Sequence, residues 1–183
     1  NIGYLQEDNP LSSTYGVEYI DYIKNALEKE TDNKTGVLEI GCGGCYTLKN
    51  LKENGFNVKG TSRRKEFVSK KISFFDLEEP NFKSIDKHFD CVIICAAITN
   101  IAECEENPNL CKKINLINTI RLIDNVIAND SFVIFLSSSA VFDGTQSFYK
   151  HTDVTNPISE YGKCKNSVEE HIKKNVNKKA CVI

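Results

Sequence analysis

Apolar residues recur along this chain in short runs that alternate with longer amphipathic segments. The strand-like runs are residues 37–41, 56–60, 72–75, 91–97 and 132–137. The helical patterns between and after them cover residues 47–53, 109–127 and 159–174. Strands that alternate with crossover helices predict a parallel sheet with helices on both faces. The predicted fold class is therefore α/β, a doubly wound parallel sheet of the Rossmann type, with a ligand at the carboxyl ends of the strands.

A polar stretch near the start of the chain marks its one soft boundary. Residues 30–36 separate an N-terminal helical segment, residues 1–35, from the first strand, so residues 36–183 form the predicted nucleotide-binding domain. The chain contains no methionine, even at its first position, and its last residues, 181–183, look like the opening of a sixth strand. We therefore expect a fragment that is truncated at its C-terminal end.

Composition fits one folded domain with a hydrophobic core. Of the 183 residues, 40% are hydrophobic and 26% are charged, and the formal net charge is -2. This balance offers no electrostatic attraction to nucleic acid or to an anionic membrane, so we expect neither as a partner. No apolar run approaches the roughly 18 residues of a membrane span, and the polar start is no signal peptide, which predicts a cytoplasmic protein.

Eight cysteines raise the question of a disulfide or metal site. Cys91 and Cys95 have even spacing in an apolar strand, so they share one face and pack as small hydrophobic residues. Cys42 and Cys45 form a Cys-x-x-Cys pair, but a structural zinc site needs a second pair at matching spacing, and the other cysteines are scattered. We predict reduced thiols and no bound metal, with a redox role for the pair as the alternative.

Tyr161 and Lys165 form the pair that indicates chemistry. They stand four residues apart in a helix that we expect to start at Asn156-Pro157, so both side chains project from one face. The lysine charge stabilises the phenolate and lowers the pKa of the tyrosine. A serine run, 137–139, follows an apolar strand, and its hydroxyl can hold a carbonyl or alcohol oxygen while the phenol gives or takes the proton. The spacing alone is common in amphipathic helices, but together these residues indicate redox chemistry on a secondary alcohol.

A glycine-rich turn follows the first strand. Gly41, Gly43 and Gly44 would let backbone approach a nucleotide at a helix N-terminus. A dinucleotide-binding turn has a third glycine for close packing of the helix on the strand, and here Tyr46 or Thr47 takes that place. The turn therefore departs from the dinucleotide pattern at one position.

From residue 60 onward, about two thirds of the chain, several segments occur in the order of a known family. They are residues 90–99 (a strand with small residues), 103–108 (a loop), 114–119 (a helix), 138–144 (a strand end with serine) and 161–165 (the tyrosine and lysine). With these segments the chain resembles the extended short-chain dehydrogenase/reductases. Within them it is similar to the sugar-nucleotide reductases of the dTDP-4-dehydrorhamnose reductase type and to the NAD-dependent epimerase/dehydratases.

The resemblance implies an NAD(P)-dependent oxidoreductase that acts on a nucleotide-linked sugar by hydride transfer, with reduction, epimerisation and dehydration all left open. Counting back from Val141-Phe142, Ser138 is the serine that matches the catalytic hydroxyl. Tyr161 would be the general acid/base, and Lys165 would lower its pKa and hold the nicotinamide ribose. The family's substrate-binding part follows the point where this chain stops, and a homodimer is compatible with the resemblance.

The implied cofactor is NADP(H), with NAD(H) as the alternative. The residues that the resemblance assigns to it are Gly41, Gly43 and Gly44 at the turn, Arg63 and Arg64 at the 2'-phosphate, Asp76 and Leu77 at the adenine, Ala96 and Ala97 at the nicotinamide, and Asn115 in the following helix. Arginines after the second strand suit the 2'-phosphate of NADP, although a solvated basic turn would look the same. Asn115 would otherwise bond to nearby backbone, and Asp76 would otherwise only terminate a strand.

Residues 1–60 also resemble a second family. The run from Leu38 to Gly43 is similar to the first motif of class I S-adenosylmethionine-dependent methyltransferases, and it contains Glu39, which has no role in a reductase. Methyltransferases place an acidic residue after the second strand, and residues 60–64 contain none. The catalytic groups therefore favour the reductase. The alternatives are a methyltransferase and a degenerate nucleotide-binding module without activity.

Overall fold

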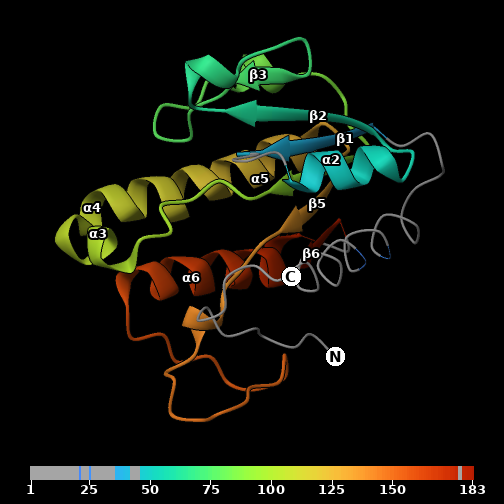
Figure 1. Ribbon diagram of the computed structural model, residues 1–183. Helices are drawn as coiled ribbons and strands as arrows, with labels where there is room; N and C mark the ends of the chain where they lie inside the picture. Colours follow the sequence, from blue (N-terminus) through green and yellow to red (C-terminus); the bar gives the residue numbers. More distant parts are fainter. Residues whose placement is uncertain (1–20, 22–24, 26–35, 42–45, 177–178) are drawn as a thin grey trace.

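One parallel sheet organises the chain. In the computed structural model, which describes Asp21, Asn25 and residues 36–41, 46–176 and 179–183, its strand order is β3-β2-β1-β4-β5-β6. The strands are β1 (Gly36–Ile40), β2 (Asn57–Ser62), β3 (Ile72–Phe74), β4 (Cys91–Ile94), β5 (Phe132–Phe135) and β6 (Ala180–Val182). All neighbouring strands pair in parallel (Figure 1). The predicted Rossmann-type α/β fold is confirmed, because this is the strand order of a dinucleotide-binding domain.

The predicted strand positions are confirmed, and the clearest difference in bounds is at β4. The apolar run covers residues 91–97, but the strand ends at Ile94. At that point Cys95 N and Ala96 N both donate to Ile40 O, at 3.0 and 2.9 Å, so the regular ladder with β1 stops. The predicted sixth strand also exists, as β6, and pairs with β5.

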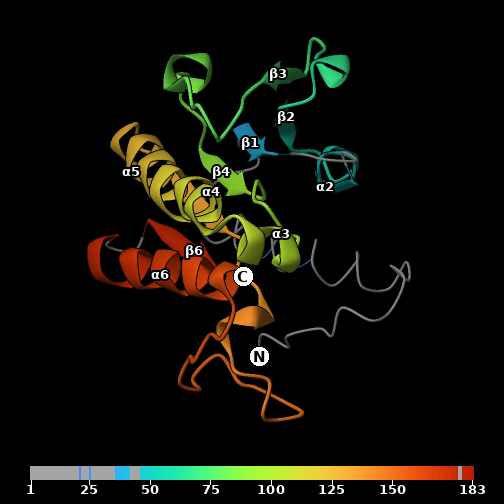
Figure 2. The same cartoon turned by 90° about the vertical axis from the view of Figure 1, so that its left-hand side faces the viewer.

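Helices cover both faces of the sheet. The α-helices are α2 (Tyr46–Glu53), α3 (Ile101–Glu106), α4 (Pro108–Cys111), α5 (Thr119–Ala128) and α6 (Glu160–Asn175). The shorter turns are η1 (Lys65–Phe67), η2 (Phe82–Ile85) and η4 (Ser139–Val141), and η3 (Lys112–Asn118) is a π-helix. Figure 2 shows α5 and α6 on one side of the sheet and α2 on the other.

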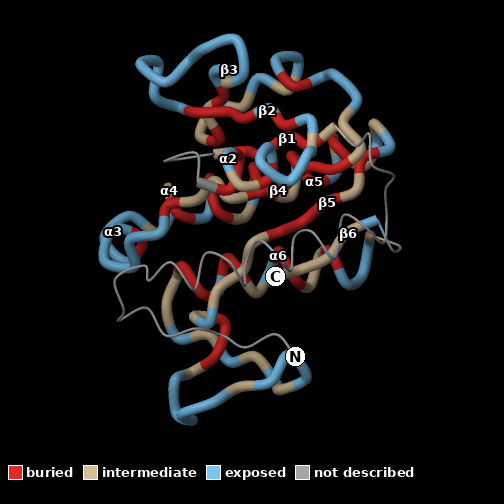
Figure 3. Tube along the Cα trace, turned by 45° about the vertical axis from the view of Figure 1, so that its right-hand side comes forward, coloured by how far each residue is buried: buried red, intermediate tan, exposed pale blue. Residues whose placement is uncertain are grey.

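The alternation of side chains along β1 divides the core into two clusters. Leu38 and Ile40 belong to a cluster that includes Leu122 of α5 and Val168 of α6. Val37 belongs to the other cluster, with the α2 residues Leu48 and Leu51. Buried residues therefore run along the central strands (Figure 3). Cys91 and Cys95 also share the second cluster, as their even spacing predicted.

Two helix boundaries correct the sequence analysis. Residues 103–106, expected in a loop, belong to α3, whose first turn is capped because Asn100 Oδ1 accepts from Glu103 N at 3.2 Å. The helix expected to start at Asn156-Pro157 begins at Glu160 instead. Its cap is Ser159, whose Oγ accepts from Gly162 N at 3.0 Å. In both cases a side chain that satisfies the free N–H groups sets the start of the helix.

The helix predicted over residues 109–127 is interrupted by the π-helix η3. Thr119 Oγ donates to Ile114 O, five residues back, at 2.9 Å. Asn115 lies in this segment and is 2% exposed. Its Oδ1 accepts from Ile98 N at 2.8 Å and its Nδ2 donates to Ile98 O at 2.9 Å, so it binds distant rather than nearby backbone. A π-bulge of this kind is frequent at functional sites.

Three cysteines that are scattered in the sequence gather around Asn115. Its Nδ2 lies 3.5 Å from Cys111 Sγ and 3.8 Å from Cys104 Sγ, and Cys111 Sγ lies 3.8 Å from Cys164 Sγ. Burial raises the pKa of Cys104 and of Cys164 to about 12, so both stay protonated. The three are free thiols that pack in the core.

Several sequence predictions fall outside the described residues. These are the glycines Gly43 and Gly44, the pair Cys42 and Cys45, and most of the segment 1–35. Asp21 and Asn25, the two described residues of that segment, are both helical. Within the described part of the chain, none of the helices has both the length and the apolar character needed to span a membrane.

The packing of α6 generates a stability prediction at Gly162. A Cβ atom there would clash with Ala140 O and lie 2.9 Å from the Ala140 carbonyl carbon. Gly162→Ala should therefore lower the free energy of unfolding by about 1–3 kcal/mol, although alanine is normally the better helix former. Urea unfolding measures the loss. The control is Ser167→Ala on the exposed side of α6, which should stay within about 0.5 kcal/mol. Equal stability of Gly162→Ala and the wild type would contradict this packing.

Candidate functional site

The site is built where the ends of β1 and β4 come close together. Gly41 has a φ of 81°, and a Cβ on it would lie 2.7 Å from Ala96 Cα. Its amide donates to Thr61 Oγ at 3.1 Å, which fixes the turn against β2. A glycine and an alanine at these two positions leave backbone exposed at the crevice, where a larger residue would fill it.

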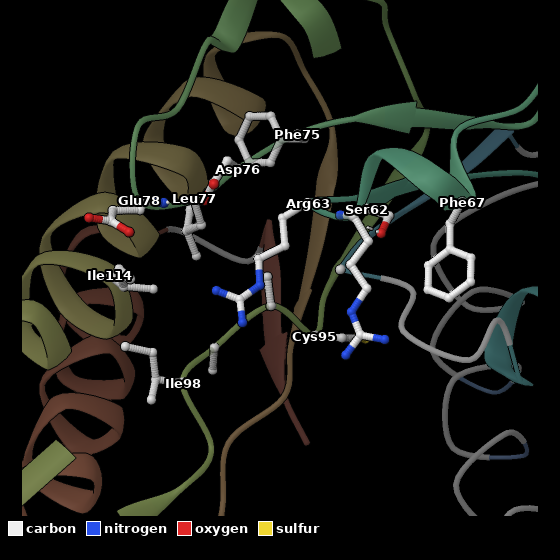
Figure 4. Close-up of a pocket in the computed structure, with 14 residues that line it drawn as sticks. Ser62, Arg63, Phe67, Phe75, Asp76, Leu77, Glu78, Cys95, Ile98 and Ile114 are labelled. Atoms are coloured by element: carbon white, nitrogen blue, oxygen red, sulfur yellow. Dashed lines mark hydrogen bonds between the residues drawn. The ribbon is translucent and has the colours of Figure 1, made fainter. Parts of the chain in front are cut away.

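A cavity of about 320 Å³ lies over this floor (Figure 4). Seven residues predicted for the cofactor line it, namely Gly41, Arg63, Arg64, Asp76, Leu77, Ala96 and Ala97. The others that line it, which the sequence reasoning missed, are Ser62, Phe67, Phe75, Glu78, Cys95, Ile98 and Ile114. The missed residues lie within three positions of a predicted residue along the chain. That closeness was the only feature of the sequence that could have indicated them.

The two arginines form the cationic side of the cavity. Figure 4 shows the Arg63 side chain extending into the cavity, with Leu77 and Ile114 on one side and Cys95 on the other. Arg64 N donates to Ser62 Oγ at 3.1 Å, and its guanidinium carbon lies 5.7 Å from the centre of the Phe67 ring. Both arginines are exposed. Guanidinium groups at this edge can bind a phosphate, because they present paired donors to its oxygens.

Asparagines from the neighbouring helix hold the opposite side of the cavity in place. Asn118 Nδ2 donates to Leu77 O at 2.9 Å and to Glu78 O at 3.1 Å. Asp76 Oδ1 accepts from Glu78 N at 2.9 Å, so it makes the turn expected of a strand-terminating aspartate and also lines the cavity. Asn115 does not line the cavity. It holds Ile98, which does line the cavity.

Tyr161 and Lys165 lie on the buried face of α6, with 7% and 4% of their surfaces exposed. Lys165 Nζ donates to Leu136 O at 2.7 Å and lies 5.8 Å from the centre of the Tyr161 ring and 4.6 Å from that of Phe135. Burial lowers the pKa of Lys165 to about 8, against the charges of Cys95 and Glu169, which raise it. The ammonium form is therefore still the larger population at neutral pH.

Ser138 follows β5 and begins the turn η4. Its Oγ accepts from Ala140 N at 3.2 Å. The same Ala140 carries the carbonyl that fits against Gly162, so the turn of Ser138 packs on the first turn of α6. Ser138 also lines a second cavity, of about 430 Å³, together with Ile101, Ser139, Ala140, Phe142, Asp143, Gly144, Gln146, Ser147, Phe148, Tyr149, Ile158 and Ser159.

A hydrogen-bond network around Asp143 shapes this second cavity, and the sequence reasoning did not find it. Asp143 Oδ1 accepts from Tyr149 OH at 2.6 Å and from Thr145 Oγ at 2.7 Å, and Oδ2 accepts from Asn156 Nδ2 at 3.1 Å. The bond from Tyr149, then those from Thr145, hold the pKa of Asp143 well below its usual range. The rings of Phe142 and Tyr149 stack with centres 4.3 Å apart. These contacts give the loop a defined conformation.

Glu39 is a buried carboxyl group next to the first cavity. It is 3% exposed, and its Oε1 accepts from Cys95 Sγ at 3.4 Å. Burial raises the pKa of Glu39 above its usual value. Cys95 separates Glu39 from the cavity, so the carboxyl group is not part of the lining.

The chain is similar in sequence to one protein family and to proteins with several different names. Residues 40–183 match the family described as the RmlD substrate binding domain. A protein named "Probable low-salt glycan biosynthesis reductase Agl14", from Haloferax volcanii, is 30% identical over 150 residues, covering 78% of this chain and 49% of that protein. Methionine adenosyltransferase 2 subunit beta from Bos taurus is 26% identical over 136 residues, covering 74% of this chain and 41% of that protein. The chain thus spans half or less of the length of these relatives.

Solved structures share the fold. A dTDP-4-dehydrorhamnose reductase from Clostridium acetobutylicum is 28% identical with a TM-score of 0.66, covering 80% of this chain and 51% of that chain. MoeE5 in complex with UDP-glucose and NAD is 24% identical with a TM-score of 0.70 over the same shares, 80% and 51%. The Bacillus anthracis dTDP-4-dehydrorhamnose reductase in complex with NADP is 19% identical with a TM-score of 0.67, covering 81% and 52%.

The family match and the fold therefore agree. The matched region begins at Ile40, the last residue of β1, and includes both cavities and all of α6. It contains each residue that the sequence analysis assigned to catalysis or to the cofactor. The chain belongs to the RmlD substrate binding domain family, whose relatives include dTDP-4-dehydrorhamnose reductases.

Proposed function

We propose that this chain is part of an NAD(P)-dependent oxidoreductase of the short-chain dehydrogenase/reductase type, acting on a nucleotide-linked sugar. The observation that carries the proposal is the juxtaposition of two features. A cavity with two arginines lies at the carboxyl ends of the strands. A buried tyrosine and lysine lie on α6, next to the turn of Ser138. Reductases and a UDP-glucose-binding protein with the same fold support this assignment.

The residues of the first cavity fit a dinucleotide. Gly41 and Ala96 leave the crevice open to a ligand, because neither has a side chain long enough to fill it. Arg63 and Arg64 offer guanidinium donors to a 2'-phosphate, and Leu77 and Ile98 offer apolar contacts to a base. The bound nicotinamide would supply or accept the hydride. NADP(H) is the preferred cofactor, and NAD(H) is the alternative.

The residues near α6 would handle the proton. Tyr161 would give a proton to the reacting sugar oxygen or take one from it. Lys165, held by Leu136 O, would favour the phenolate by its charge. Ser138 would orient the reacting oxygen through its hydroxyl, which in this structure accepts from Ala140 N and keeps its own proton for donation. The same groups serve reduction, epimerisation and dehydration.

A second function follows from one specific observation. Relatives from several vertebrates carry the name "Methionine adenosyltransferase 2 subunit beta". This supports an alternative in which the chain serves as a subunit of a methionine adenosyltransferase and its nucleotide-binding fold has no reductase activity of its own. It is one form of the inactive nucleotide-binding module named above.

Parallel calorimetric titrations discriminate between these functions. The proposed reductase should bind NADPH or NADH and oxidise it when a nucleotide-linked keto-sugar is added, because the ketone accepts the hydride. The subunit alternative requires stable association with a methionine adenosyltransferase and no oxidation of NADPH. Binding of S-adenosylmethionine alone would instead favour the methyltransferase.

Tyr161→Phe tests the catalytic role most directly. The substitution removes the acid/base hydroxyl and keeps the ring, so turnover in the full-length enzyme should fall by at least about a hundredfold. The dissociation constant of NADPH should stay within about threefold. Stopped-flow or steady-state absorbance of NADPH measures the first quantity and calorimetry the second. Turnover at the wild-type rate would end the catalytic proposal.

Arg63→Ala tests the choice of cofactor. Bonds from an arginine to a charged phosphate contribute on the order of 1.5–3 kcal/mol, so NADPH binding should weaken roughly tenfold to a hundredfold. NADH has only a hydroxyl at that position, and its binding should change little. Lys59→Ala, on β2 but outside this cavity, is the matched control. Equal losses for both cofactors would show that Arg63 acts on the shared part of the dinucleotide or on the fold.

Lys165 predicts a pH dependence of stability. Its pKa is about 8 in the folded protein, against an ordinary value of 10.5, so the unfolded state binds more protons between these limits. The free energy of unfolding should therefore rise with pH from about 8 to about 10.5, by on the order of 3 kcal/mol in total, and be flat below about pH 8.

The comparison that isolates this effect is Tyr161→Phe against Tyr161→Phe/Lys165→Met, because both variants lack the phenol that lies beside the lysine. Urea unfolding at closely spaced pH values gives the difference between the two. A difference that does not vary between pH 8 and 10.5 would mean that burial does not disfavour the charged lysine.

A further inference from the structure

The buried face of α6 carries a third ionisable residue that the proposed reaction does not use. Tyr161, Lys165 and Glu169 follow one another at intervals of four residues, so they form one row along the helix. Glu169 is 5% exposed, as deeply buried as the other two. Its neighbour Glu170 faces solvent and pairs with Lys173 and Lys174. A carboxylate is costly to bury, so its retention in this row calls for a specific partner.

Glu169 has two partners: Lys173, whose Nζ lies 3.9 Å from Glu169 Oε2, and the end of β5. Ser137 Oγ donates a short hydrogen bond to Glu169 Oε1. Ser137 stands between Leu136, whose carbonyl accepts from Lys165 Nζ at 2.7 Å, and Ser138. Two consecutive residues of the strand end are therefore tied to two consecutive turns of α6. The serine that should orient the substrate oxygen comes directly after these ties.

Glu169 also bears on the charge of Lys165. The titratable groups that face Lys165 are Tyr161 and Glu169 from α6 and Cys95 from the segment after β4. Glu39 of β1 lies behind Cys95 and accepts its hydrogen bond. Burial lowers the pKa of Lys165, and Cys95 and then Glu169 raise it, so the charge of Glu169 opposes the effect of burial. A buried ammonium without such a counter-charge carries an uncompensated desolvation cost.

We propose that Glu169 is a positioning residue of this site, which holds the Ser137 end of β5 against α6 and supplies the counter-charge of the buried Lys165 ammonium. The proposal rests on the proposed function for its consequence in catalysis. Its physical content, the coupling of Glu169 to Lys165, can be measured without turnover.

The decisive experiment follows Lys165 itself. In ¹⁵N-lysine-labelled protein, the Lys165 side-chain signal, assigned by its loss in Lys165→Met, is titrated by NMR in the wild type, Glu169→Asp, Glu169→Gln and the control Glu170→Gln. The midpoint should fall by about one pH unit in Glu169→Gln, because one opposite charge is removed. Glu169→Asp keeps the negative charge, but its side chain is one methylene shorter. The Lys165 midpoint should therefore fall by less than in Glu169→Gln. Glu170→Gln should leave the midpoint within about 0.3 unit, because the Glu170 side chain is 40% exposed and pairs with Lys173 and Lys174.

The catalytic consequence is read from the pH profile of the full-length enzyme. Loss of the lysine charge should move the alkaline limb of the kcat profile of Glu169→Gln to lower pH by the same amount. The KM for the sugar nucleotide should change by less than about threefold. If Glu169 had only a structural role, its substitution would lower the fraction of active protein at every pH and would not shift the alkaline limb of the kcat profile.

Coinciding Lys165 midpoints in the wild type and Glu169→Gln would overturn the proposal. If Glu169→Gln does not fold, Glu169→Asp decides in the same way, because an unchanged midpoint in that variant contradicts the coupling. Full turnover of Tyr161→Phe would instead contradict the proposed function. The coupling of Glu169 to Lys165 would still be tested by the lysine titration.

Discussion

The side of the candidate site that carries Tyr161, Lys165 and Ser138 depends on how closely the first turns of α6 pack against the end of β5 and the turn after it. Because Gly162 has no side chain, the backbone of the helix can approach Ala140 O. One turn further, Lys165 Nζ reaches Leu136 O at 2.7 Å. These contacts fix the distance between the helix that carries the phenol and the turn that carries Ser138. A displacement of about 1 Å in such a contact is enough to reduce catalysis strongly, since the reacting groups must be held in register.

The cofactor side of the site depends on a different kind of contact. There the floor is backbone, left open by Gly41 and Ala96, and the walls are loops that follow β2, β3 and β4. Loops at this edge have no ladder to hold them, and two asparagines of η3 take over that role. Asn115 holds Ile98, and Asn118 holds the segment at residues 77–78. The π-helix thus supports the walls of the cavity without lining most of it.

The proposed function has a cost in stability. The row of polar side chains on α6 occupies a helix face that packs on the main apolar cluster, where aliphatic residues would be more stable. Lys165 shows the cost directly, because burial lowers its pKa to about 8. Such a conflict between local preference and position is expected at functional sites and not elsewhere in a core. It is an independent reason to regard the tyrosine and lysine as functional.

The sequence by itself determined the class of fold and half of the lining of the first cavity. Strand positions and the β–α alternation follow from period-2 and period-3.6 patterns, and residues at strand ends gather because parallel strands end at one edge. What it could not determine are contacts between segments distant along the chain. The hydrogen-bonded residues Ser137 and Glu169 are 32 residues apart in the sequence, and Asn115 and Ile98 are 17 apart. The spacing of Glu169 from Lys165 was visible, but its burial was not, because a glutamate carries no apolar signal and its burial is decided by the distant segments that pack against the helix.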